Sequence, residues 1–194
     1  YGGVKLAAAE RAFRERVGSL DPTAWGAPDL PEQDNAAVPV RAGALGVVLG
    51  KADGRLVGEL TQVPVISWNN EQKDHLRTIL RSNASALELL HRSFDLPRAS
   101  FGVELVHDFA LKERMPLVKI MWAARLLHSQ ARLARIEGDR AGMLHAVESM
   151  SGVARAVHQE PLLVCQLIGL AVERMMLRAL HELAGAPEVP PAEL

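Results

Sequence analysis

The sequence predicts an all-α protein built as an antiparallel array of helices. Residues 116–185 hold three successive helix-length amphipathic segments, with room only for tight turns between them. Pro116 opens the first segment, Gly138 and Pro161 mark the two divisions, and Gly185 ends the third. The composition agrees, because 48% of the residues are hydrophobic while only 4% are aromatic. The apolar content is therefore mostly Ala, Leu and Val, which favours helices over strands.

The order of these segments indicates a solenoid-like or tetratricopeptide-like arrangement. Gly138 and Gly185 end alternate helices at an interval that lies within the two-helix periods of solenoid arrays. The interval from Gly138 to Pro161 is longer than the second helix of a tetratricopeptide repeat allows. We therefore expect packing that resembles this repeat, rather than the repeat itself.

The N-terminal third is predicted to begin with a helix and to continue as a loop-rich segment. Residues 4–18 carry a helical apolar pattern, so a helix is expected over residues 1–18. Residues 19–68 are expected to be loop-rich, because prolines crowd the first part of this segment. A helix is nevertheless predicted over residues 36–50, after the N-cap candidates Asp34 and Asn35.

A minor β-ribbon near residues 47–66 is the competing prediction for this segment. Two short apolar runs flank Asp53-Gly54, which is a competent hairpin turn. Residues 58–68 are expected to be extended in either case.

The middle of the chain is predicted to form one amphipathic helix and one short helix. Asn69 or Asn70 caps the first, which is expected to end near Phe94 because Pro97 blocks its continuation. A short helix is expected around residues 103–111. These helices and the C-terminal array would form one helical domain over residues 1–185, with a flexible Pro-rich tail over residues 186–194.

The faces of the long C-terminal segments show different patterns. The first segment carries a polar stripe opposite an apolar one. An acidic partner, if the protein has one, is expected to bind at this polar stripe. In the third segment apolar residues cover nearly the whole circumference from Leu162 to Val172, so this helix is expected to be the most buried of the three. The polar stripe consists of Arg125, His128, Arg132 and Arg135.

The charge and the apolar runs argue against nucleic-acid binding and membrane insertion. Twenty-two basic residues against 23 acidic residues give a net charge of -1, without the single-sign field that phosphate binding requires. The longest apolar run, Leu162 to Val172, falls well short of the roughly 20 residues that span a bilayer. The single cysteine, Cys165, lies inside this run and is expected to pack as a small buried hydrophobe.

The segment from Pro31 to Ala37 resembles a P-x-x-[DE]-N-A-A signature of large, uncharacterised bacterial helical proteins. In those proteins a Gly-Asp turn and an EP-x-L-[IV] helix start follow, and here they correspond to residues 133–139 and to Glu160 through Val164. This sequence departs from the pattern at Pro39, which interrupts the helix expected after Asn35.

The resemblance implies a longer parent protein with an N-terminal membrane segment and with further helices after Leu194. It therefore implies an extracytoplasmic domain of a membrane-anchored bacterial protein. It implies no activity, because the family has none assigned.

Two Glu-x-x-His spacings are the strongest chemical signal in the sequence. Glu88 with His91 and Glu104 with His107 each place two metal-ligating side chains on one helical face. Di-metal carboxylate bundles carry such pairs on separate long helices, whereas Pro97 separates two closely spaced pairs here. Exposed polar faces are therefore the favoured interpretation, and no metal or cofactor is expected.

Catalytic motifs are also lacking. No Gly-x-Ser-x-Gly elbow or phosphate-binding glycine loop is present. The leading hypothesis is therefore a non-catalytic interaction or scaffold domain that binds a protein or peptide, and a contiguous exposed apolar patch would distinguish it.

The alternative is a small-molecule, metal-binding or hydrolytic site between residues 19–68 and the helices. His107, His128 and Glu104 would be its polar contributors, and at least two of them would have to converge in a concave site. A homo-oligomer formed through the third long helix is a further expectation, and it requires that helix to be exposed in the monomer.

Overall fold

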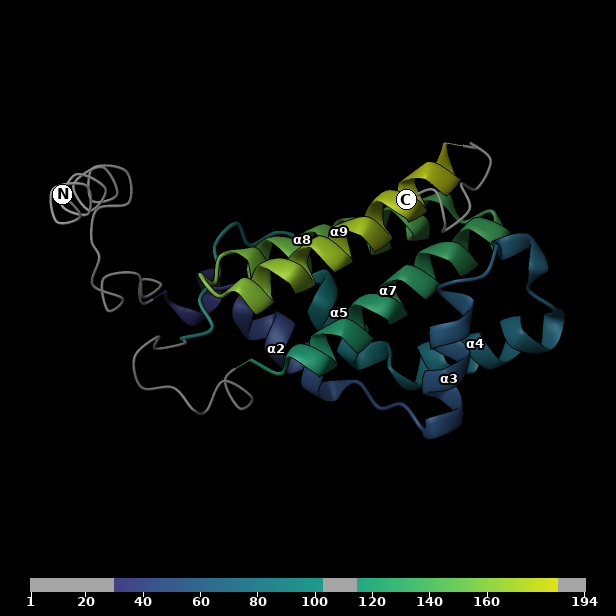
Figure 1. The fold of residues 1–194 in the computed structure, drawn as a ribbon, viewed down its shortest axis with the longest axis horizontal. Helices are drawn as coiled ribbons and strands as arrows, with labels where there is room; N and C mark the ends of the chain where they lie inside the picture. The colour runs from purple at the N-terminus through teal and green to yellow at the C-terminus, as the bar shows by residue number, and fades with distance from the viewer. Residues whose placement is uncertain (1–29, 103–114, 185–194) are drawn as a thin grey trace, which may run out of the picture.

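A computed structural model describes residues 30–102 and 115–184, and within these ranges the protein is all-α, as the sequence predicts. Figure 1 shows the helices arranged along one long central helix. Their bounds are η2 (Glu32–Asp34), α2 (Ala37–Gly46), α3 (Lys51–Leu60), η3 (Val65–Ser67), α4 (Asn70–Ser82), α5 (Ala84–His91), α7 (Leu117–Glu137), α8 (Arg140–His158) and α9 (Leu163–Leu183).

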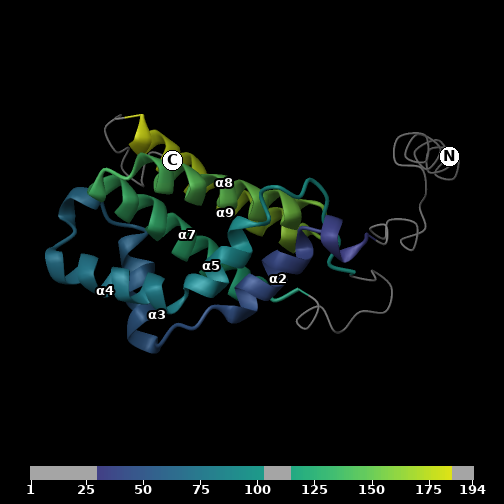
Figure 2. The same ribbon diagram turned by 180° about the vertical axis from the view of Figure 1, so that it is seen from behind.

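Helix α7 is the central element of the described fold. It packs against α8 and α9 on one side and against α2, α3, α4 and α5 on the other, and Figure 2 shows the same two layers from behind. Buried residues of α7 contribute Ile120, Ala123, Ala124, Leu126 and Leu127 to a core shared by both layers. This arrangement confirms the all-α class, whereas a solenoid-like order is not confirmed.

The three long C-terminal helices begin and end close to the predicted positions. Pro116 precedes α7, and Gly138 ends it in the left-handed conformation with a φ of 76°. A residue with a side chain is strained in that conformation, so glycine suits this turn. Asp139 then caps α8, because its carboxylate accepts a hydrogen bond of 2.9 Å from the backbone N–H of Gly142.

The β-ribbon predicted near residues 47–66 is wrong. The helix expected over residues 36–50 is present as α2, although it ends at Gly46, and residues 51–60 form α3 instead of a loop or an extended chain. The presumed hairpin turn lies inside α3, where Asp53 accepts a hydrogen bond from the backbone N–H of Gly50 at 3.1 Å. An acidic side chain in this position satisfies the N-cap backbone N–H, which is one half of a capping box, and favours the start of a helix. No strand is present in residues 30–102 and 115–184, where the pairing of Asn35 with Arg98 is an isolated bridge.

The single helix predicted from Asn69 to Phe94 is divided in two at Asn83. Asn69 caps α4 as predicted, with Gln72 completing the capping box. The buried side chain of Asn83 accepts a hydrogen bond from the backbone N–H of Val48 at 2.8 Å and donates one to the Val48 carbonyl at 3.1 Å. Its amide also bonds the Ile79 carbonyl at 2.9 Å. This side chain therefore ties the α4–α5 junction to the α2–α3 connection.

The segment that carries the family resemblance has a structural role. Asn35 is buried. Its amide nitrogen donates a hydrogen bond of 2.8 Å to the Ser100 carbonyl, and its amide oxygen accepts one of 2.9 Å from the Ser100 backbone N–H. Ala36 and Ala37 pack in the core beside it. These contacts hold the chain after α5 against the start of α2, so burial and hydrogen bonding explain these residues without a functional site.

The structure also bears on the predictions for Cys165 and for membrane insertion. Cys165 is buried, as predicted, and burial raises the pKa of its thiol to about 11. The helix of residues 1–18, the short helix near residues 103–111 and the tail of residues 186–194 lie outside the described residues. No described helix combines the length and the apolar character needed to cross a membrane.

Replacing Asn83 tests whether its hydrogen bonds determine the packing of the α2–α3 connection. Asn83→Ala should lower the free energy of unfolding by about 1–3 kcal/mol, because two backbone groups of Val48 lose their partners in a buried region. Ser82→Ala, at the exposed neighbouring position, should change it by less than about 0.5 kcal/mol. Urea denaturation measures both, and equal effects of the two substitutions would contradict this role.

Candidate functional site

The polar stripe predicted on α7 is not a continuous exposed face. His128 and Arg132 are fully buried, so the expectation that they meet solvent or a partner on one stripe is wrong for these two residues. Arg125 is partly exposed, with its guanidinium 4.7 Å from the centre of the Trp122 ring, and Arg135 is exposed. The helical period correctly places the four residues on one side of α7. However, α9 covers the two central residues of this stripe, His128 and Arg132.

The buried guanidinium of Arg132 joins three parts of the chain. It forms an ion pair with Glu182 of α9, with 2.9 Å between Nε and Oε1. Its terminal nitrogens donate to the carbonyls of Leu60 and Val63, the second at 2.8 Å, and the guanidinium lies 5.1 Å from the centre of the Trp68 ring. An arginine satisfies several acceptors at once, which makes burial of its charge tolerable.

His128 lies one turn before Arg132 and is uncharged in the folded protein. Burial, followed by the nearby positive charges of Arg132 and Arg178, lowers the pKa of His128 to about 3. Neither ring nitrogen has a hydrogen-bond partner among the described residues. A buried imidazole without contact with solvent cannot exchange protons with a substrate, so His128 does not contribute to the small-molecule site that the sequence suggested.

The metal-ligand pairs predicted from the sequence are described only in part. Glu88 is exposed on α5, and Glu104 and His107 lie outside the described residues. His91 instead stacks on His145 with ring centres 4.0 Å apart. Within residues 30–102 and 115–184, no group of three or more His, Cys, Asp or Glu side chains is close enough to hold a metal ion.

His91 also contacts a serine, but this pair is not arranged for nucleophilic catalysis. The Nδ1 atom of His91 lies 2.5 Å from Oγ of Ser149, and that hydroxyl donates a hydrogen bond of 2.7 Å to the carbonyl of His145. Ser149 has no exposed surface. Burial, followed by the electrostatic effect of the neighbouring His145 ring, lowers the pKa of His91 to about 4. A buried hydroxyl bonded within its own helix cannot reach a substrate.

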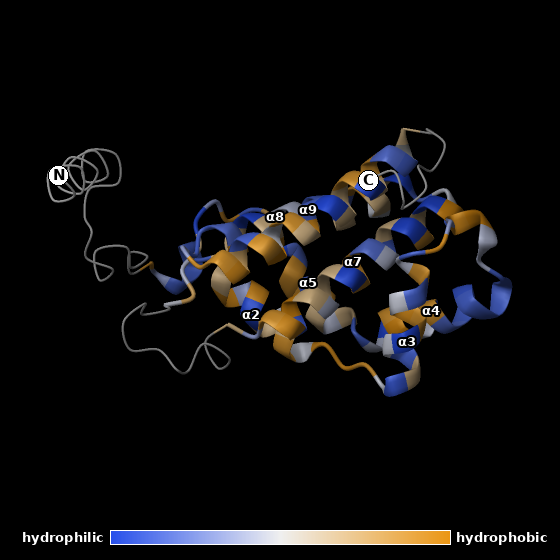
Figure 3. Cartoon of the chain, viewed as in Figure 1, coloured by the Kyte–Doolittle hydropathy of each residue, from blue (hydrophilic) through white to orange (hydrophobic). Residues whose placement is uncertain are grey.

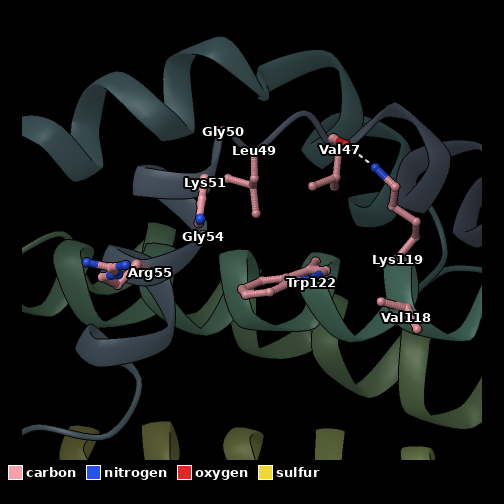
Figure 4. Close-up of a pocket in the computed structure, with 9 residues that line it drawn as sticks. All are labelled: Val47, Leu49, Gly50, Lys51, Gly54, Arg55, Val118, Lys119 and Trp122. Atoms are coloured by element: carbon pink, nitrogen blue, oxygen red, sulfur yellow. Dashed lines mark hydrogen bonds between the residues drawn. The ribbon is translucent and has the colours of Figure 1, made fainter.

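A concave site lies between the α2–α3 connection and the first turns of α3 and α7. Its volume is about 430 Å³, and Figure 4 shows the Trp122 ring as its floor, with Leu49 pointing towards the ring. Lys119 donates a hydrogen bond of 3.0 Å to the carbonyl of Val47 at its edge. This site lies between residues 19–68 and the long helices, where the sequence suggested one, but its lining contains none of the predicted polar contributors. The lining residues are Val47, Leu49, Gly50, Lys51, Gly54, Arg55, Val118, Lys119 and Trp122.

Helix α9 presents a row of exposed leucines, so the prediction that it is the most buried helix is wrong. Only one side of α9 packs against α7 and α8, and Figure 3 shows hydrophobic residues along this helix at the edge of the bundle. The exposed fractions are 76% for Leu163, 58% for Leu167, 56% for Leu170 and 59% for Leu177. We call these residues, with the 40% exposed Val164, the leucine face.

Side-chain size separates the two sides of α9 only in part. The fully buried apolar residues of α9 are small or medium, and four of its leucines point outwards. Larger residues of the same helix, Ile168, Met175, Met176 and Leu180, are half-buried against the core. At one close approach, a Cβ atom on Gly169 would lie 2.5 Å from the His158 ring, so only glycine fits there. The buried set includes Cys165, Gly169, Val172 and Ala179.

The pKa of His128 predicts a loss of stability on acidification. Because the unfolded state binds a proton near pH 6.5 and the folded state only near pH 3, stability is fully present above pH 6.5 and falls as the pH decreases towards 3. The limiting slope is ~1.4 kcal/mol per pH unit for each such histidine. His128→Leu should reduce the slope measured by urea denaturation between these pH values, whereas Leu127→Met, at a neighbouring buried position, should keep it. An unchanged slope in His128→Leu would contradict the buried neutral state.

No protein-family model matches this chain, and comparisons with curated proteins and with solved structures find no match either. The functional interpretation therefore depends on the leucine face and on the concave site beside Trp122.

Proposed function

We propose that this chain is a non-catalytic helical interaction domain that self-associates through the leucine face of α9. The observation that carries the proposal is the exposure of large apolar side chains along a helix whose other side is packed. Contiguous apolar surface on a folded domain usually marks a binding surface, because its exposure to water is unfavourable.

The spacing of the leucine face suits a helical partner. Leu163, Leu167, Leu170, Arg174 and Leu177 follow one another at alternating intervals of four and three positions, and His181 continues the series. A seam with this alternation is the pattern by which two helices pack side by side in a coiled coil. The expected occupant is therefore another amphipathic helix rather than an extended peptide.

The area of the leucine face is sufficient for a dimer of this chain. From the exposed fractions, its side chains present ~500 Å² of apolar surface, so two copies would bury ~1,000 Å² together. This is near the lower limit for a specific interface, and it supports a reversible dimer rather than an obligate one.

Arg174 favours an antiparallel arrangement of the two α9 helices. In a parallel pair in register, the Arg174 side chains of both copies would meet in the same layer and repel each other. In an antiparallel pair, Arg174 of one copy lies beside Leu170 of the other, where its aliphatic stem can pack and its guanidinium can reach water. The opposed helix dipoles also favour the antiparallel pair.

Sedimentation equilibrium of the complete chain tests this proposal. The wild type should approach twice the mass of one chain as its concentration rises through the micromolar range. Leu167→Glu should weaken association at least tenfold, because a charge would be buried in the seam. Ile66→Glu is the matched control, since Ile66 is 96% exposed on η3 and is not part of the leucine face.

Circular dichroism confirms that each variant keeps its helices. A wild-type chain that remains monomeric up to submillimolar concentration would contradict the proposal. Equal weakening by Leu167→Glu and Ile66→Glu would also contradict it, because the effect would then not depend on the leucine face.

A further inference from the structure

We propose that the concave site beside Trp122 binds a small organic anion with a planar, apolar body, such as an aromatic carboxylate. This inference is independent of self-association, because no residue of α9 lines the site. Its volume of about 430 Å³ lies within the range of small-molecule pockets.

The shape and the apolar lining of the site suit a flat ligand. Figure 4 shows the Trp122 ring lying along α7, with Leu49 and Val47 on the opposite wall and Val118 at one end. Arg125 lies over the Trp122 ring at 4.7 Å from its centre, which helps to fix the orientation of the ring. An aromatic ligand stacked on a held indole ring gains contact area without ordering a flexible side chain.

Gly54 allows α3 to lie close to this floor. A Cβ atom on Gly54 would lie 3.6 Å from Cη2 of Trp122, so any larger side chain at this position would extend over the ring. Gly58 is one turn further along α3, and a Cβ atom there would meet nothing within 4 Å. The two glycines therefore form a matched pair, of which only Gly54 borders the site.

The charge of the lining determines the sign of the ligand. Lys51, Arg55 and Lys119 border the site, and no acidic residue is among the described residues of its lining. None of these three forms an ion pair with a carboxylate among the described residues. Unpaired cations beside an apolar surface attract an anionic group, since the low-polarity wall strengthens the electrostatic interaction.

The nearest acid along the chain, Asp53, forms no ion pair with these cations. The carboxylate of Asp53 accepts a hydrogen bond from the backbone N–H of Gly50 and lies 2.8 Å from Nε2 of His75. Lys119 already donates one hydrogen bond to the Val47 carbonyl, which holds its ammonium group at the rim of the site. A carboxylate at this rim would accept hydrogen bonds from Lys51, Arg55 or Lys119 while its ring covers Trp122.

Isothermal titration calorimetry of the complete chain with 2-naphthoate tests this inference. One saturable site is expected, and 2-naphthylmethylammonium, a cation of similar shape, should bind at least tenfold more weakly. The double substitution Lys51→Gln with Arg55→Gln should weaken 2-naphthoate binding at least tenfold, because it removes two of the three positive charges.

Two leucine substitutions on α3 separate filling of the site from a general effect on the fold. Gly54→Leu should abolish 2-naphthoate binding by covering Trp122, whereas Gly58→Leu should leave the affinity within twofold of the wild type. The inference is wrong if 2-naphthoate shows no saturable binding at millimolar concentration. It is also wrong if the cation binds equally well or if Gly54→Leu keeps the wild-type affinity.

Loss of binding in both leucine variants would count against the inference as well, provided that circular dichroism shows intact helices. Sedimentation of the same samples keeps this test separate from self-association. A chain that binds 2-naphthoate but stays monomeric would support the inference and contradict only the proposed function.

Discussion

The buried ion pair between Arg132 and Glu182 is the interaction on which the described fold most depends. It connects the C-terminal third of α7 with the last turn of α9, and the same guanidinium bonds the carbonyls of Leu60, at the end of α3, and of Val63. Arg178 of α9 reinforces this connection with a hydrogen bond of 3.3 Å to the Thr61 carbonyl. Removing one partner of such a pair would leave a buried charge uncompensated, which is strongly unfavourable.

This connection also fixes which side of α9 faces solvent. With Glu182 directed towards α7, the small residues of α9 lie against α7 and α8, where Gly169 approaches the His158 ring. The large leucines are then left on the outer side. Four exposed leucines on one side of a helix are unusual for a solvent-facing surface, and self-association would remove those leucines from water. On the opposite side of α7, Trp122 and the cations around it form a separate surface with different chemistry.

The sequence predicted the helical class and the limits of α7, α8 and α9, because Pro116, Gly138 and Pro161 act on the local backbone. It did not predict the break at Asn83, whose side chain bonds Val48, a residue distant in sequence. It also misassigned Asp53-Gly54 as a hairpin turn, since the same residues favour a helix start when Gly50 precedes them. Periodicity placed His128 and Arg132 on a polar face, but only tertiary contacts with α9 and residues 60–63 show that this face is buried. The sequence suggested a site between residues 19–68 and the long helices, but not the residues that line the basic site beside Trp122, because α3 and α7 bring them together only in the fold.

Distances between spin labels on α9 test the central claim, that two copies associate through antiparallel leucine faces. Cys165 is buried with a thiol pKa of about 11, so labelling should be confined to an introduced cysteine. Ala171→Cys and His181→Cys place labels nearly three turns apart on α9 and keep Arg174. The account predicts a short distance between the two labels at position 171 and a distance about 20 Å longer between those at position 181. Equal distances at both positions would indicate a parallel pair, and the absence of any distance between copies would contradict association through α9.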